Sequence, residues 1–101
     1  MKKIGKMVHH IEDELKSAKC YAELYIENKI DSNVDLEITN TFKSMAQDEI
    51  KHCEFWHTLA VSTIDRVMKI YTPTKEMQEK WDMTHQKYMA DMAEVKRMLS
   101  M

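Results

Sequence analysis

The sequence contains almost no glycine or proline, with one residue of each among 101. Average usage is roughly 7% and 5%. Collagen-like, loop-rich and linker architectures need these residues, and the turns of β-hairpins commonly need glycine. Hydrophobic residues make up 44% of the chain and charged residues 32%, a balance typical of a folded chain rather than a disordered one. We therefore expect an all-α fold in which residues 1–101 form a single domain.

The sequence also lacks a charge excess, a membrane span and a cysteine framework. Fifteen basic and 17 acidic residues give a net charge of −2, which provides no basic surface for nucleic acid. The longest apolar run is far shorter than a membrane helix, and the start Met-Lys-Lys-Ile-Gly-Lys lacks the apolar core of a signal peptide. Cys20 and Cys53 are too few for a disulfide framework. We expect a cytoplasmic protein with no nucleic-acid or membrane partner.

Three amphipathic segments predict three long helices, at about residues 4–29, 35–70 and 75–99. Asp31-Ser32-Asn33 separates the first two, because these residue types favour turns and helix N-caps. Thr72-Pro73-Thr74 ends the second, because the residue before a proline avoids helical angles. The expected apolar stripes are Ile4, Met7, Ile11, Leu15, Ala18, Ala22 and Tyr25; then Ile38, Phe42, Met45, Glu49, His52, Trp56, Leu59 and Thr63; then Trp81, His85, Tyr88, Met92, Val95 and Leu99.

The lengths of these segments indicate how the helices pack. Short connections make neighbouring helices antiparallel. The second helix, at residues 35–70, would be roughly 54 Å long, which is long for a chain of 12.0 kDa. Three such rods enclose a thin core and leave one flank exposed. We expect an antiparallel bundle of three long helices that a homodimer or a higher homo-oligomer completes.

Two polar residues, Glu49 and His52, interrupt the apolar stripe of the second helix. By helical phase both point inward. A Glu-x-x-His pair places a carboxylate and an imidazole one above the other on one helix face, where they can share a metal ion. An inward carboxylate needs a compensating partner, because burying it alone costs several kcal/mol.

The first helix offers that partner in Glu14. In an antiparallel hairpin, residues equidistant from the turn lie at the same level, and the midpoint between Glu14 and Glu49 falls within Asp31-Ser32-Asn33. Glu14 also lies on the edge of the first apolar stripe. We therefore predict that Glu14, Glu49 and His52 converge. Two carboxylates and one imidazole suit iron, manganese or zinc.

Two stretches of the chain resemble known motifs of the ferritin-like superfamily. Met45-Ala-Gln-Asp-Glu49-Ile-Lys-His52-Cys-Glu-Phe55 is similar to the second-helix motif of rubrerythrins. Glu14-Leu-Lys-Ser-Ala-Lys-Cys-Tyr21 looks like their opening motif. With His9-His10-Ile-Glu-Asp-Glu14 and Ala93-Glu94-Val95-Lys96, the chain also resembles short ferritin-like proteins of phages and prophages of gut Firmicutes. The resemblance implies a ferritin-like bundle, a one- or two-iron site and, if the site is catalytic, oxidation of ferrous iron by dioxygen or peroxide.

The chain departs from the ferritin-like pattern in its third helix. Full di-iron sites use four helices and a second Glu-x-x-His, whereas this third helix has Asp82-x-x-His85. The other candidate in this helix is Glu94. Glu94 is expected at the level of the cluster along the bundle but faces away from the apolar stripe of its helix, whereas His85 lies on that stripe but about eight residues from the level of His52. Which of the two completes the site stays open. A second copy of the chain could instead complete it, as in the small encapsulated ferritins that this hairpin resembles.

Two functions of different classes follow from these observations. The first is a ferritin-like metal-binding protein, with Glu14 and Glu49 as carboxylate ligands, His52 as the nitrogen ligand, and iron, manganese or zinc bound at a site partly shared between subunits. The second is a non-catalytic helical interaction protein, phage- or prophage-encoded, that keeps a relic of the metal site and binds a protein partner.

Overall fold

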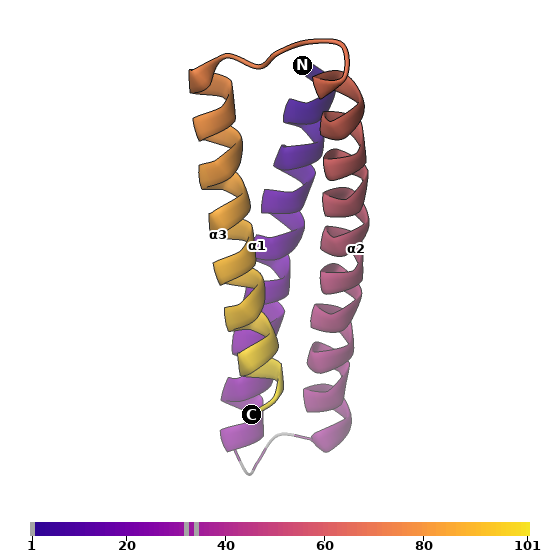
Figure 1. Ribbon diagram of the computed structural model, residues 1–101. Coiled ribbons are helices and arrows are strands. Elements are labelled where there is room, and N and C mark those ends of the chain that lie inside the picture. The colour runs from indigo at the N-terminus through magenta and orange to yellow at the C-terminus, as the bar shows by residue number, and fades with distance from the viewer. Residues whose placement is uncertain (1, 32, 34) are drawn as a thin grey trace.

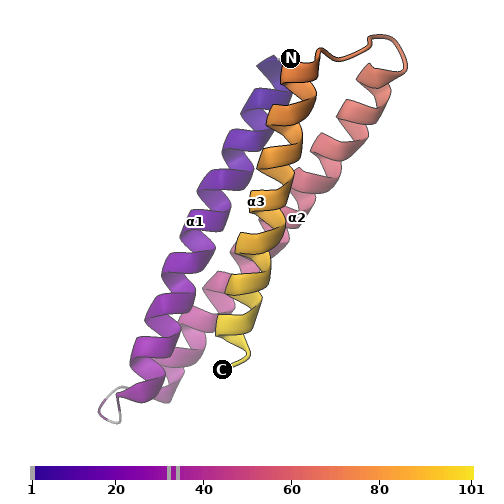
Figure 2. The ribbon, with the colours of Figure 1, turned by 60° about the vertical axis from the view of Figure 1, so that its left-hand side comes forward.

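The computed structural model describes residues 2–31, 33 and 35–101, so Ser32 of the expected turn lies outside the described residues. The described chain forms three helices: α1 (Lys2–Ile30), α2 (Leu36–Met68) and α3 (Lys75–Leu99). They lie side by side as an elongated bundle of 57 × 18 × 17 Å (Figures 1 and 2). The all-α prediction is confirmed, and each helix begins and ends within two residues of its expected bounds. None of the helices in the described chain has the length and apolar content to cross a membrane.

Side-chain caps explain where α2 and α3 begin. Asp35 precedes α2, and its carboxylate accepts a hydrogen bond of 2.8 Å from the backbone N–H of Glu37. Thr74 precedes α3, and its hydroxyl accepts one of 3.1 Å from the backbone N–H of Met77. Each cap satisfies a first-turn donor that has no partner within the helix.

Helix α1 is the centre of the bundle. It packs against both α2 and α3, whereas α2 and α3 share few contacts. Figure 1 shows α2 and α3 on either side of α1, joined by a connection at the end that holds the N-terminus. The predicted core faces of α1 and α3 are confirmed. The buried apolar residues of these two helices are Met7, Ile11, Leu15, Ala18, Ala22, Tyr25, Tyr88, Met92, Val95, Met98 and Leu99.

The predicted core face of α2 is wrong, because the residues that the helix buries lie about one position later in the sequence than the expected ones. The stripe expected from Ile38 to Thr63 has no fully buried member, and Ile38 is 50% exposed. The residues that α2 does bury are Thr39, Ala46, Ile50, Cys53 and Ala60. Most are smaller than the members of the expected stripe, so a pattern based on large apolar residues points to the neighbouring face.

Small buried side chains bring α1 and α2 close together. Ala18, Ala46 and Cys53 are completely buried. The thiol of Cys53 lies 3.7 Å from the backbone carbonyl oxygen of Ile11 and donates a hydrogen bond to it. A side chain of one helix thus touches the main chain of the next. The larger apolar side chains of α2 consequently flank this contact, and Met45 and Phe55 stay exposed.

Candidate metal centre

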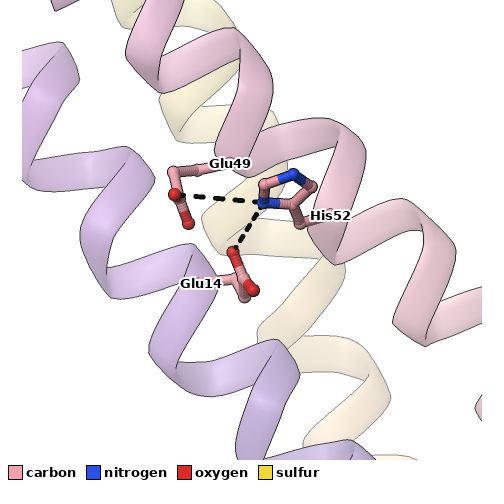
Figure 3. A group of neighbouring side chains, drawn as sticks. All are labelled: Glu14, Glu49 and His52. Carbon is pink, nitrogen blue, oxygen red and sulfur yellow. Dashed lines mark hydrogen bonds and ion pairs between the residues drawn. The ribbon is translucent and has the colours of Figure 1, made fainter.

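The structure brings Glu14, Glu49 and His52 together, as the sequence predicts. Glu14 extends from α1 toward the pair on α2 (Figure 3). The Nδ1 of His52 lies 3.1 Å from Oε2 of Glu14 and 3.9 Å from Oε1 of Glu49. One donor atom from each residue lies within 4.8 Å of the other two. The antiparallel pairing of α1 and α2 thus places residues separated by 38 positions in direct contact.

The cluster lies at the edge of the α1–α2 contact. The side chains of Glu14 and Glu49 are 22% and 23% exposed, whereas that of His52 is 57% exposed. The expectation that His52 points into the core is therefore wrong. The cause is the rotation of α2, which places neighbouring Cys53 against α1. One side of the cluster is accordingly open to solvent.

The two carboxyl groups of the cluster repel each other when both are ionised. The pKa of Glu49 is raised from 4.5 to about 7, chiefly by a hydrogen bond shared with Glu14, and further by partial burial and the charge of Glu14. His52 acts in the opposite direction and lowers it. Like charges at this separation favour a shared proton or a cation between the oxygens. A proton or a cation between the carboxylate oxygens would relieve this repulsion.

The two weaker candidate ligands lie elsewhere. His85 lies against His57, with 3.1 Å between Nδ1 of His85 and Nε2 of His57. Glu94 is exposed, and its carboxylate accepts two hydrogen bonds, of 2.7 and 3.0 Å, from the guanidinium of Arg97. That pairing lowers the pKa of Glu94. Within the described part of one chain, the structure brings neither residue into the cluster.

His57 is a chemically notable residue that the sequence reasoning missed. It follows Cys53 by one turn on the face that α2 turns toward the bundle, and its side chain is partly buried. The available signal was the row of small residues at Ala46, Cys53 and Ala60, which marks that face. A core face defined by this row would have placed His57 at its edge, one turn after Cys53.

A cavity of about 920 Å³ lies at the opposite end of the bundle from the α1–α2 connection. Residues from all three helices line it, and the lining is largely apolar; it includes Ile4, Val8, Ile64, Val67, Met77 and Trp81. Around it, Met68 at the end of α2 and Ile70 and Tyr71 just after the helix are exposed. This end of the molecule therefore presents a concentration of apolar surface.

Searches for related proteins returned no match among protein-family models, curated proteins or solved structures.

Proposed function

We propose that this chain is a metal-binding helical protein and that Glu14, Glu49 and His52 bind a first-row divalent transition metal. The observation that carries the proposal is the convergence of the three donor atoms within 4.8 Å of one another, from two helices. Iron is the first candidate, because the two helix motifs resemble those of ferritin-like proteins. Manganese and zinc are the alternatives.

The donor set fits such an ion. Two carboxylate oxygens and one imidazole nitrogen suit divalent iron, manganese and zinc. A divalent cation would also relieve the repulsion that raises the pKa of Glu49 to about 7. Bound iron would supply one-electron exchange with dioxygen or peroxide, the ferroxidase-type chemistry that the ferritin-like resemblance implies. Glu14 and Glu49 would provide negatively charged oxygen ligands, and His52 would provide the nitrogen ligand.

We further propose that a second copy of the chain covers the cluster, in a homodimer or a larger homo-oligomer. Three protein donors leave coordination positions free, and the exposure of His52 opens them to solvent. Met45 lies one turn before Glu49 and Phe55 lies one turn after His52, and both are exposed, so apolar side chains flank the cluster along α2. Such a surface suits a second helical hairpin.

Metal loading and molecular mass test this function together. The untagged protein is loaded anaerobically with ferrous iron, dialysed and examined by elemental analysis and light scattering. We expect near-stoichiometric metal in a dimer or larger assembly. A protein that retains no metal after loading would contradict the metal site, and a metal-loaded monomer would contradict only the sharing of the site.

Metal affinity should depend on pH in a defined direction. The Glu49 carboxyl has a pKa of about 7 and must lose its proton to ligate a metal. Below pH 7 each bound ion therefore displaces a proton, and the affinity should fall about tenfold for each pH unit. Calorimetric titration with manganese between pH 8 and pH 5.5 measures this slope. An affinity that does not change over that range would exclude Glu49 as a ligand.

The apolar end of the bundle favours a second candidate function. The cavity of about 920 Å³ and the exposed Met68, Ile70 and Tyr71 suit a protein partner, which would make this chain a non-catalytic interaction protein. In that case the Glu14–Glu49–His52 cluster is a relic. Substituting Glu49 or His52 would then change stability alone, with metal content at zero before and after. The metal analysis therefore separates the two functions.

A further inference from the structure

A pair of histidines connects α2 to α3 away from the carboxylate cluster. The Nε2 atom of His57 lies 3.1 Å from the Nδ1 atom of His85, and the two rings are nearly parallel, with their centroids 5.1 Å apart. The ring of Tyr88 stacks on His57 at 4.2 Å, and Trp81 lies 5.9 Å from His85. Aromatic rings from α3 thus hold both imidazoles in place. The pair is partly buried.

The protonation of His57 suits metal binding. Partial burial lowers the pKa of His57 below 6.5, and the neighbouring His85 lowers it further. An imidazole binds a metal in its neutral form. Near neutral pH, His57 is therefore ready to act as a nitrogen donor without first losing a proton.

The position of the pair matters because α2 and α3 share few contacts. Among the described residues, the polar contacts between these two helices are the His57–His85 pair and an ion pair of 3.3 Å between Glu54 and Lys96. The side chains of that ion pair are more than half exposed, so it adds little stability. A bond through the two imidazoles would therefore be the strongest link between α2 and α3.

We propose that His57 and His85 form a second metal site, which binds a late first-row divalent ion such as Zn²⁺ and fastens α3 to α2. Zinc–imidazole bonds are about 2.0–2.1 Å long, so two nitrogens on one tetrahedral ion lie roughly 3.3 Å apart. The observed 3.1 Å is close to that separation. In the metal-free protein this contact is a hydrogen bond between the two rings, so one of the two nitrogens carries a proton. Zinc would replace that hydrogen bond: the donating ring would hold its proton on its other nitrogen, small rotations would direct both lone pairs to the ion, and water would fill the remaining positions.

The site differs in chemistry from the Glu14–Glu49–His52 cluster and does not depend on it. Nitrogen donors favour zinc, nickel and copper, whereas carboxylate oxygens also serve manganese. Two imidazoles without a carboxylate should therefore bind Zn²⁺ and leave Mn²⁺ in solution. This contrast allows the two sites to be measured separately in one protein.

Zinc titration of a simplified protein tests the proposal. The parent carries Glu49→Gln and His52→Ala, which remove two donors of the carboxylate cluster, and Cys20→Ser, which removes an exposed thiol. His57→Phe and His85→Phe keep an aromatic ring at each position. His9→Gln is the matched control, because His9 is an exposed histidine outside the pair, lying against Asp13. Calorimetry with Zn²⁺ and with Mn²⁺ gives the stoichiometry and affinity, and circular dichroism reports the helix content.

We expect the parent and His9→Gln to bind one Zn²⁺ and no Mn²⁺, and each phenylalanine variant to bind zinc at least about tenfold more weakly. Zinc should also raise the melting temperature of the parent but not of the variants. A parent that binds no zinc, or a variant that binds it unchanged, would overturn the proposal. If a variant loses helix content, a second measurement on the parent replaces the comparison: NMR follows the ring resonances of His57 and His85 as zinc is added. Both His57 and His85 must shift together as zinc is added, and a shift of neither or of one alone would overturn the proposal.

Discussion

Replacing Glu49 by glutamine is expected to abolish stoichiometric metal binding and, in the metal-free protein, to raise the melting temperature at pH 8. The amide keeps the size of the side chain but removes the charge that repels Glu14. In the folded protein the pKa of Glu49 is about 7, above its ordinary value of 4.5. Ionising Glu49 therefore costs stability, and this cost grows as the pH rises from 4.5 through 7.

The variant should accordingly gain stability at pH 8 and nearly match the unmodified protein at pH 4, where Glu49 is protonated in both the folded and the unfolded state. Discounted for screening by water, the gain is about 1 kcal/mol, or roughly 5 °C in melting temperature. Thermal unfolding at the two pH values measures it, and elemental analysis after ferrous loading measures the loss of metal.

Two further variants complete this test. His52→Ala should also lose the metal, because it removes the nitrogen donor. Glu23→Gln is the matched control, since Glu23 is an exposed glutamate of α1 outside the cluster. It should leave metal content and pH dependence unchanged. Stoichiometric metal in a protein that carries both Glu49→Gln and His52→Ala would show that the ligands are elsewhere.

Replacing Ala18 by leucine is expected to destabilise the protein strongly, because it forces a larger side chain into the α1–α2 contact. The contact between Cys53 and Ile11 shows which residues of the two antiparallel helices lie at the same level. Ala46, seven residues before Cys53, therefore lies level with Ala18, seven residues after Ile11. Both alanines are completely buried. Leucine at position 18 would push the helices apart, at a cost of about 2–3 kcal/mol.

Chemical denaturation measures this loss, which corresponds to a fall of roughly 10 °C or more in melting temperature. Ala90→Leu is the matched control, because Ala90 is an exposed alanine of α3 and leucine also suits a helix. We expect it to change stability by less than about 0.5 kcal/mol. Equal effects of the two substitutions would mean that the α1–α2 contact tolerates larger side chains than its packing implies.

Much of the candidate site could be predicted from the sequence. The convergence of Glu14 with Glu49 and His52 followed from the position of one turn, because an antiparallel hairpin pairs residues equidistant from it. The assignment of these residues as metal ligands stays a prediction. The pairing of His85 with His57 did not follow in the same way. It depends on the rotation of α2, because the face expected from the large apolar residues did not include His57.

The sequence by itself determined the all-α class, the bounds of the helices and the core faces of α1 and α3. These features depend on local signals, namely capping residues, one proline and large apolar side chains at helical spacing. Only the tertiary structure decided the rotation of α2. Ala46, Cys53 and Ala60 are small, and their burial depends on how closely a neighbouring helix approaches, which is a property of two helices together. That rotation leaves His52 at the surface and places His57 beside α3.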